Sequence, residues 1–325
     1  MQILNEYLNV RNSTRKLTDS EFEKILPTLA EELVSVNYKI KYSEEKLRAD
    51  WKKLLDYDTS SPDRFTASTV RVGMKLCEHF FPNFYSIQNK NNESFESLWV
   101  KENLEKILRW NRKSHSTPYL SELKRGIYFC CGLTKNTMFR PHLAKMICDK
   151  YKFERVFDPC AGWGGRMLGV CASGAEYIGF EPNPETYRHL LELKEYLNLN
   201  ARIINDKAEN FTSYDILNAD GVLTSPPYYN LEIYSKSGCE TKYDTYETWL
   251  TEWLTPLIMD ITDAFHNVFS CWNVHNIGKM KLQDDIIHIH EVLGYKKIDE
   301  FGIVSSKRQT NNQKQKNTDS TIIFT

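Results

Sequence analysis

The second half of the chain alternates short, β-branched apolar runs with longer stretches of helical periodicity. Such alternation is typical of a parallel sheet with helices packed on its faces. Seven strands are predicted, at residues 155–157, 177–180, 202–205, 221–224, 268–274, 297–304 and 321–324. Intervening helices are predicted at residues 166–172, 184–197, 246–266 and 281–293. The pattern therefore predicts an α/β fold with a mostly parallel sheet.

The first half of the chain has a different residue pattern, which predicts mostly helices. Apolar positions recur with helical spacing in residues 17–37, 43–57, 66–80 and 95–110, and Thr18 is a plausible N-cap for the first of these helices. A chain of 325 residues is long enough for a large core and a second module. We therefore expect a helical domain over residues 1–136 and an α/β domain over residues 137–325.

Several classes of protein are disfavoured by what the sequence lacks. The eight cysteines form no CxxC pair and no Cys/His grouping with zinc-finger spacing, so free thiols and no metal site are expected. No run approaches the ~20 apolar residues of a membrane span, and the N-terminus does not resemble a signal peptide. These features predict a soluble, cytoplasmic protein of a bacterium or of a virus within its host cell.

Charge is unevenly distributed, although the formal net charge is only −1. Residues 101–150 contain eleven Lys or Arg against four Asp or Glu. Basic stretches attract phosphates because binding releases condensed counterions. A solvated helix face has the same composition, however, so charge alone does not decide between these interpretations.

A glycine-rich turn follows the first predicted strand of the α/β domain and precedes a helix. Its glycines are Gly162, Gly164 and Gly165, and Asp158 precedes the first of them by four residues. Glycine permits a backbone that turns from strand to helix to approach a ligand closely. A pyrophosphate would be repelled by Asp158, whereas a cationic amino-acid group would be attracted, and Arg166 could pair with a ligand carboxylate. An NAD site nevertheless remains an alternative, because a glycine turn alone is a weak signal.

Acidic residues end the next two predicted strands. Glu181 suits a ribose diol, since a carboxylate accepts hydrogen bonds from both hydroxyls, and NAD enzymes share this feature. Asp206 could accept a hydrogen bond from an adenine amine, although a helix cap or turn residue is an equally good interpretation.

Together these residues resemble the cofactor motifs of class I S-adenosylmethionine methyltransferases. The similarity lies in Asp-Pro-Cys-Ala-Gly-Trp-Gly-Gly at 158–165, in Glu181 and Asp206, and in Phe-Arg-Pro-His at 139–142, which is similar to a segment near the methionine end. The resemblance implies a Rossmann-like, seven-stranded, mostly parallel sheet and S-adenosyl-L-methionine as cofactor. The cofactor-binding residues that it implies are Phe139, Arg140, Pro141, Asp158, Cys160, Ala161, Gly162, Gly164, Arg166, Glu181, Pro182, Asp206 and Ser225.

The most informative motif is Ser225-Pro226-Pro227-Tyr228, which follows the apolar run at 221–224. Open α/β sheets bind ligands at this edge, and two prolines remove two N–H donors and stiffen the backbone. The Ser225 hydroxyl and the Pro226 carbonyl could accept both hydrogens of an exocyclic amine and localise its lone pair. Tyr228 could stack on an extruded base. A simple loop with core tyrosines is the alternative, which the position after a strand disfavours.

This second motif resembles the (Asp/Asn/Ser)-Pro-Pro-aromatic signature of amino-methyltransferases. In that family Ser is commonest among DNA cytosine-N4 enzymes and Asp or Asn among adenine-N6 enzymes. The resemblance implies direct methyl transfer to a flipped base, as in restriction–modification systems, with Ser225, Pro226, Pro227 and Tyr228 as catalytic residues. Carbon-5 enzymes use a cysteine after proline, but Cys160 lies within the glycine motif, which argues against covalent catalysis. Adenine-N6 or RNA methylation, a protein-amide substrate and a non-catalytic binding module remain alternatives.

No room for a target-recognition region follows the second motif, so recognition would fall to the helical residues 1–136. The basic stretch at 101–125, with interleaved aromatic residues, is the best candidate for contacts with DNA. RNA is not excluded as the partner. The predicted nucleic-acid-binding residues are Lys101, Arg109, Arg112, Lys113, Lys124, Arg125, Tyr229, Lys307 and Arg308.

Overall fold

A computed structural model describes residues 7, 17–60, 65–133, 136–216, 218–234, 242–266, 268–304 and 317–325. The chain divides into two compact units. Unit 1 comprises Met1–Ile40, Pro82–Thr137 and Asn230–Ile233, and unit 2 comprises Lys41–Phe81, Met138–Tyr229 and Tyr234–Thr325. Among the described residues, every helix is too short or too polar to span a lipid bilayer.

Unit 2 is built on one eight-stranded sheet with the order β1-β7-β8-β6-β5-β2-β3-β4. Only β8 runs antiparallel to its neighbours. The strands are β1 (Phe65–Ala67), β2 (Arg155–Asp158), β3 (Glu176–Phe180), β4 (Ala201–Ile204), β5 (Gly221–Thr224), β6 (Phe269–Val274), β7 (Lys297–Val304) and β8 (Asn317–Phe324). The predicted α/β fold class is confirmed, with one strand more than the seven expected.

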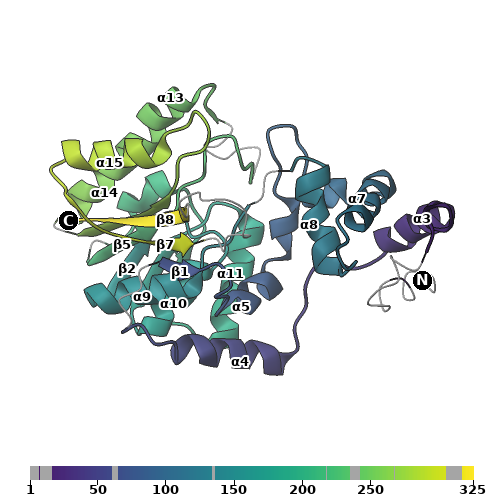
Figure 1. Ribbon diagram of the computed structural model, residues 1–325. Coiled ribbons are helices and arrows are strands. Elements are labelled where there is room, and N and C mark those ends of the chain that lie inside the picture. The colour runs from purple at the N-terminus through teal and green to yellow at the C-terminus, as the bar shows by residue number, and fades with distance from the viewer. Residues whose placement is uncertain are drawn as a thin grey trace. The chain divides into compact units, whose positions relative to one another are not determined.

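Helices cover both faces of this sheet (Figure 1). On one side lie α9 (Pro141–Tyr151), α10 (Gly165–Ser173) and α11 (Pro184–Leu197), with α4 (Glu44–Leu55) and α5 (Met74–Phe80) packed against them. On the other side lie α13 (Tyr246–Trp249), the π-helical turn η3 (Leu250–Leu254), α14 (Thr255–Ala264) and α15 (Leu282–Val292). Their apolar faces form the largest core cluster together with the central strands. The apolar side chains along residues 246–266 therefore belong mostly to this core.

One predicted helix is wrong. Residues 66–80 were expected to be helical throughout, but β1 occupies Phe65–Ala67 and pairs in parallel with β7, and α5 begins only at Met74. Gly73 precedes α5 with φ of +80°, a left-handed conformation that separates strand and helix. Because β1 joins the sheet, residues 41–81 belong to unit 2, whereas the sequence analysis assigned them to the helical domain.

Unit 1 is helical, as expected for most of residues 1–136. It contains α3 (Asp19–Val34), the 3₁₀ turn η1 (Pro82–Ser86), α6 (Phe95–Leu98), α7 (Lys101–Lys113) and α8 (Leu120–Cys130), packed on a core of their own. The predicted cap of the first helix is confirmed. Thr18 and Glu21 form a capping box, in which each side chain bonds the other's backbone N–H.

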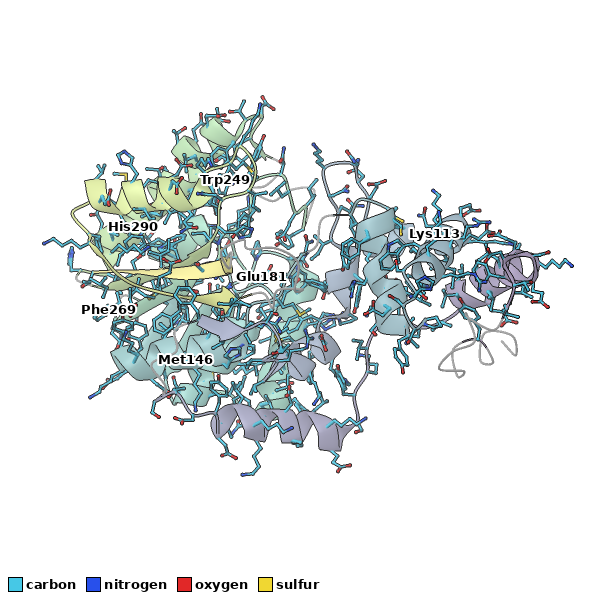
Figure 2. The ribbon with its side chains drawn as sticks, viewed as in Figure 1. Lys113, Met146, Glu181, Trp249, Phe269 and His290 are labelled. Atoms are coloured by element: carbon cyan, nitrogen blue, oxygen red, sulfur yellow. The ribbon has the colours of Figure 1, made fainter. Side chains whose placement is uncertain are left out.

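Two histidines of unit 2 are fully buried and have a depressed pKa. Burial lowers the pKa of both His142 and His290 to about 4. In His290, which Figure 2 places between α15 and the sheet, Nδ1 donates to the carbonyl of Ile286 and Nε2 accepts from the Ser270 hydroxyl. This neutral ring therefore has both nitrogens satisfied, and protonation of Nε2 would end its role as acceptor for the Ser270 hydroxyl.

The two buried histidines should make the free energy of unfolding depend on pH in the acidic range. A folded-state pKa of about 4 lies below the unfolded value near 6.5, so the neutral-ring contribution is complete above pH 6.5 and is lost as pH falls towards 4. The loss should reach about 3 kcal/mol for each histidine. We expect His290→Gln to flatten the pH dependence of urea unfolding in this interval, whereas His288→Gln, at an exposed position, should leave it unchanged.

Candidate functional site

The two sequence motifs meet at one edge of the sheet. Strands β2 and β5 are parallel neighbours, with Phe157 in register with Val222. One residue after Phe157, the Asp158 carboxylate accepts a hydrogen bond from the Thr224 hydroxyl at 2.8 Å. Ser225 is the next residue after Thr224, so the proline motif and the glycine turn start side by side. This is the crevice in which open α/β sheets bind their ligands.

Asp158 supports the glycine turn from beneath. It is fully buried, and its Oδ1 accepts from Thr224 and from the backbone N–H of Cys160, while its Oδ2 accepts from Arg166 Nε at 2.6 Å and Tyr177 Oη at 2.8 Å. All four acceptor positions of the carboxylate are thereby occupied. The structure thus assigns Asp158 a supporting role, in contrast to the predicted direct contact with a cationic ligand group.

Arg166 belongs to the same buried network. Besides its ion pair with Asp158, its guanidinium donates to the carbonyls of Cys160 and Ala161. The side chain is only 6% exposed, so it holds the turn rather than a ligand carboxylate. Burial, together with the nearby Asp158 charge, raises the pKa of Tyr177, which keeps its hydroxyl protonated as a donor.

The glycines of this turn are needed for different structural reasons. Gly162 and Gly164 have φ of +58° and +70°, which side-chain-bearing residues rarely adopt. Gly165 is needed for a close approach, because a Cβ there would lie 2.2 Å from the carbonyl oxygen of Phe139. The segment at 139–141, whose residues Phe139, Arg140 and Pro141 were predicted to bind the cofactor, therefore lies directly against the start of α10.

Glu181 lies beside the glycine turn at the end of β3, near the strand tips in Figure 2. Its Oε2 accepts from the backbone N–H of Gly162 at 3.0 Å, and its Oε1 accepts from that of Asn183 at 2.9 Å. These two bonds orient the carboxylate, and Pro182 stiffens the turn that follows, an arrangement compatible with a ribose diol.

Asp206 is a turn residue in this structure. It accepts hydrogen bonds from the backbone of Lys207, from Asn210 Nδ2 and from Tyr214 Oη, all between 2.8 and 2.9 Å. The bonds from Asn210 and its neighbours lower the pKa of the Asp206 carboxyl. The interpretation as a turn residue therefore accounts for Asp206, which lies two residues before the turn η2 (Ala208–Ser213).

The Ser-Pro-Pro segment presents acceptors. Ser225 is half-buried, and its hydroxyl makes no hydrogen bond to any residue that the structure describes. Neither Pro226 nor Pro227 has an N–H, so no backbone donor competes at this point of the loop. A ligand N–H group would here meet oxygen atoms that have no other partner in the described part of the chain.

Tyr228 is held by a histidine that the sequence analysis did not identify. Its hydroxyl bonds Nδ1 of His275 at 3.0 Å and accepts from the backbone N–H of the same residue, also at 3.0 Å. The two rings are tilted by 50° with centroids 5.1 Å apart. His275 directly follows β6, the neighbour of β5. Its place at a strand end was visible in the sequence, but the adjacency of these two strands was not.

Tyr229 was predicted to contact nucleic acid, and this prediction is wrong for the described structure. The residue is only 7% exposed, and its hydroxyl donates to the carbonyl of Tyr243. Its ring lies against Trp249 in the core, with centroids 6.2 Å apart. Its φ of +45° turns the chain so that this side chain points inwards. Tyr229 therefore anchors the end of the Ser-Pro-Pro-Tyr motif to the core.

Cys160 shows no sign of nucleophilic chemistry. Burial raises the pKa of its thiol well above the ordinary value, and the nearby Asp158 acts in the same direction. Because the thiolate is the reactive species, a protonated thiol agrees with the expectation that catalysis is not covalent. Among the described residues no group of three or more His, Cys, Asp or Glu could hold a metal ion.

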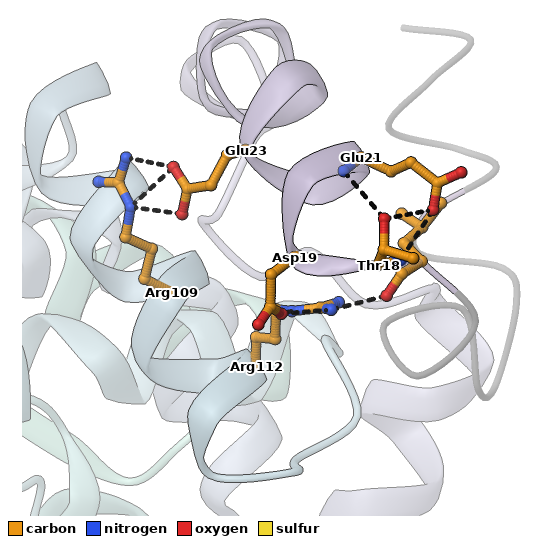
Figure 3. Close-up of polar contacts among 7 residues, drawn as sticks. Thr18, Asp19, Glu21, Glu23, Arg109 and Arg112 are labelled. Carbon is orange, nitrogen blue, oxygen red and sulfur yellow. Dashed lines mark hydrogen bonds and ion pairs between the residues drawn. The ribbon is translucent and has the colours of Figure 1, made fainter.

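Most of the basic candidates are engaged within unit 1. Arg109 pairs with Glu23 and Arg112 with Asp19, each at 2.8 Å, and these contacts fasten α3 to α7 (Figure 3). Lys101 pairs with Glu31. Charge counting could not reveal these carboxylate partners, which lie about 70 to 93 residues away in sequence.

The other basic candidates differ in whether their charged groups contact other residues. Lys124 donates to the Tyr38 carbonyl and the Tyr85 hydroxyl, and Arg125 pairs with Glu122. Lys113, labelled in Figure 2, is exposed and has no carboxylate partner among the described residues. The predicted residues Lys307 and Arg308 lie outside the described part of the chain.

No family model matches the sequence, and no curated protein matches it either. Solved structures that resemble part of this chain include a precorrin 8W decarboxylase from Methanobacterium thermoautotrophicum, with 13% identity over 60% of this chain and 94% of the other, at a TM-score of 0.40. A precorrin-6y C5,15-methyltransferase from Geobacter metallireducens has 14% identity, coverages of 59% and 90% and a TM-score of 0.40. An rRNA methylase from Streptococcus thermophilus has 12% identity, coverages of 58% and 98% and a TM-score of 0.38.

Proposed function

We propose that the protein is an S-adenosylmethionine-dependent methyltransferase that methylates an exocyclic amine of a DNA base, cytosine N4 in particular. The observation that carries this proposal is the hydrogen bond between Thr224 and Asp158. It joins the strand end that leads into the proline motif to the strand end that leads into the glycine turn. A methyl donor over the turn and an amine at Ser225 would therefore be neighbours.

The cofactor side of the site fits the proposed ligand. Glu181, oriented by its two backbone hydrogen bonds, would hold the ribose diol. The turn around Gly162 would let the backbone approach the ligand, and residues 139–141 would lie at its methionine end. S-adenosylmethionine, when bound, supplies an electrophilic methyl group on a sulfonium. Asp158 and Arg166 would shape the turn through their buried network without touching the ligand.

The amine side of the site fits a planar NH₂ group. The lone pair of such an amine is delocalised into its ring and is a poor nucleophile in that state. The Ser225 hydroxyl oxygen and the Pro226 carbonyl would accept one hydrogen each, which favours a pyramidal nitrogen with its lone pair directed at the methyl group. Direct transfer would form the nitrogen–carbon bond as the methyl–sulfur bond breaks, which would leave a neutral thioether, and the nitrogen would then lose one N–H proton to solvent. This route needs no nucleophilic side chain, in agreement with the protonated thiol of Cys160.

Tyr228 would supply the stacking surface for the base. A base inside a duplex cannot reach a strand edge of this kind, so the target would be extruded and stacked on the Tyr228 ring, which stabilises it by about 1–3 kcal/mol. His275 would keep that ring from rotating, because it bonds the hydroxyl through both its backbone and its imidazole.

The chemistry can be tested by nucleoside mass spectrometry after incubation of the protein with labelled cofactor and separate DNA, RNA and protein pools. Labelled N4-methylcytosine in the DNA pool is the expected product. N6-methyladenine would retain the enzyme class and change the base, and label in RNA would change the polymer. A protein that bound the cofactor but labelled none of the pools would contradict the proposal.

The role of His275 gives a separate prediction. His275→Ala should lower kcat/KM on DNA by about 3- to 10-fold, the usual value of one hydrogen bond, and Tyr228→Phe, which removes both bonds to His275, should lower it by at least as much. The double variant should be no worse than Tyr228→Phe, since that change already removes the bond that His275→Ala breaks. His275→Asn, whose carbonyl can still accept, should recover part of the loss. Multiplicative losses, with altered cofactor affinity, would show that His275 acts elsewhere.

A further inference from the structure

Two aromatic side chains stack on the surface of unit 1. Trp110 of α7 and Phe129 of α8 lie with ring centroids 5.7 Å apart and planes 17° from parallel. Phe129 is 65% exposed, and the guanidinium carbon of Arg125 lies 5.4 Å from the centroid of its ring. A largely exposed phenyl ring that its neighbours hold in this way offers flat apolar surface to a partner.

Unpaired positive charge lies on the same side of α7. Lys106, Trp110 and Lys113 are spaced by four and three residues, so they lie along one face of the helix. Both lysines are exposed, and neither has a carboxylate partner among the described residues. Arg109 and Arg112, by contrast, point to the acidic residues of α3 (Figure 3). The available cations therefore lie along the aromatic pair.

We propose that this aromatic–basic face, formed by Lys106, Trp110, Lys113, Arg125 and Phe129, binds single-stranded DNA. Unpaired bases would stack on Phe129, and the two lysines would contact the phosphates on either side. The choice of DNA rests on the function proposed above, but the face is separate from the residues that would hold the target base. Binding would be tolerant of sequence, because every base has a π-face.

Other occupants fit the same features less well. The bases of a duplex are already stacked on one another, so a duplex would use the lysines and leave Phe129 unused. A second copy of this chain placed face to face would bring the exposed lysines of both copies together, and like charges oppose such an interface. Of these three occupants, only single-stranded DNA uses both the flat ring and the positive charge.

Fluorescence anisotropy with a labelled single strand of about 16 nucleotides tests the proposal on the full chain without cofactor. Phe129→Ala should weaken binding by about 5- to 140-fold and leave its salt dependence unchanged. The pair Lys106→Gln and Lys113→Gln should lower the slope of log affinity against log salt by about 1.4, since each phosphate contact contributes about 0.7. Phe129→Trp, which retains the flat ring, should bind like the wild type.

Matched controls lie on unit 2. Val292→Ala removes an exposed apolar side chain, and Lys46→Gln with Lys53→Gln removes two exposed lysines of α4; both should bind the strand like the wild type. Unchanged affinity in Phe129→Ala, equal affinity of the wild type for single strand and duplex, or a self-association lost in Phe129→Ala would overturn the proposal.

These binding outcomes do not depend on turnover. If DNA is methylated but Phe129→Ala binds normally, only this inference fails; if no pool is labelled but the binding loss appears, only the proposed reaction fails.

Discussion

Ser225→Ala should lower kcat by about 10²- to 10³-fold, the usual effect of removing one preorganised polar group from a reacting centre. The Ser225 hydroxyl has no hydrogen-bond partner among the described residues, so its removal should disturb the fold little. The affinity for S-adenosylmethionine should stay within about twofold, because Glu181 and the glycine turn are untouched. Single-turnover methylation and calorimetric titration of the cofactor measure the two effects.

Two further variants make this result specific. Ser225→Asp retains an acceptor at the same place and should keep measurable activity, whereas Ser173→Ala, which removes a serine hydroxyl at the end of α10, should keep full activity. Turnover of Ser225→Ala close to the wild-type value would show that the amine is bound elsewhere, and the proposed chemistry would then have no basis.

Arg166→Met should destabilise unit 2 by about 3–5 kcal/mol, the usual cost of leaving one partner of a buried ion pair uncompensated. Asp158 is fully buried and would keep its charge with only the three neutral donors Thr224, Tyr177 and the Cys160 N–H. Urea unfolding followed by circular dichroism measures the loss. Cofactor affinity should also fall, because the same network holds the glycine turn.

Asp158, the partner of Arg166 in this buried ion pair, supplies the control. Asp158→Asn in the Arg166→Met background removes the uncompensated charge, so the double variant should be more stable than Arg166→Met alone. Arg188→Met breaks an exposed pair with Glu192 and should cost less than about 1 kcal/mol. A double variant less stable than Arg166→Met would show that lost packing, rather than a stranded charge, explains the destabilisation.

The amino-acid sequence was sufficient where the signal is local. A parallel strand covered on both faces is a continuous apolar run, and each of the seven predicted strands is present in the sheet. The capping box at Thr18 and the helix start at Pro184 depend on residues a few positions apart. The short strand β1 was missed, since three residues carry no period and their pairing with β7 spans more than 200 residues.

The functional residues show the same difference between local signals and long-range contacts. Which residue types end the strands was readable from the sequence, and so was the order of the two motifs. The partners of those residues were not, because Asp158 meets Thr224 and Tyr228 meets His275 across 66 and 47 residues of chain. Whether Arg109 is paired or Tyr229 buried likewise depends on which elements pack together. Strand order, burial and ion pairing are properties of the packed chain, so only the tertiary structure decided them.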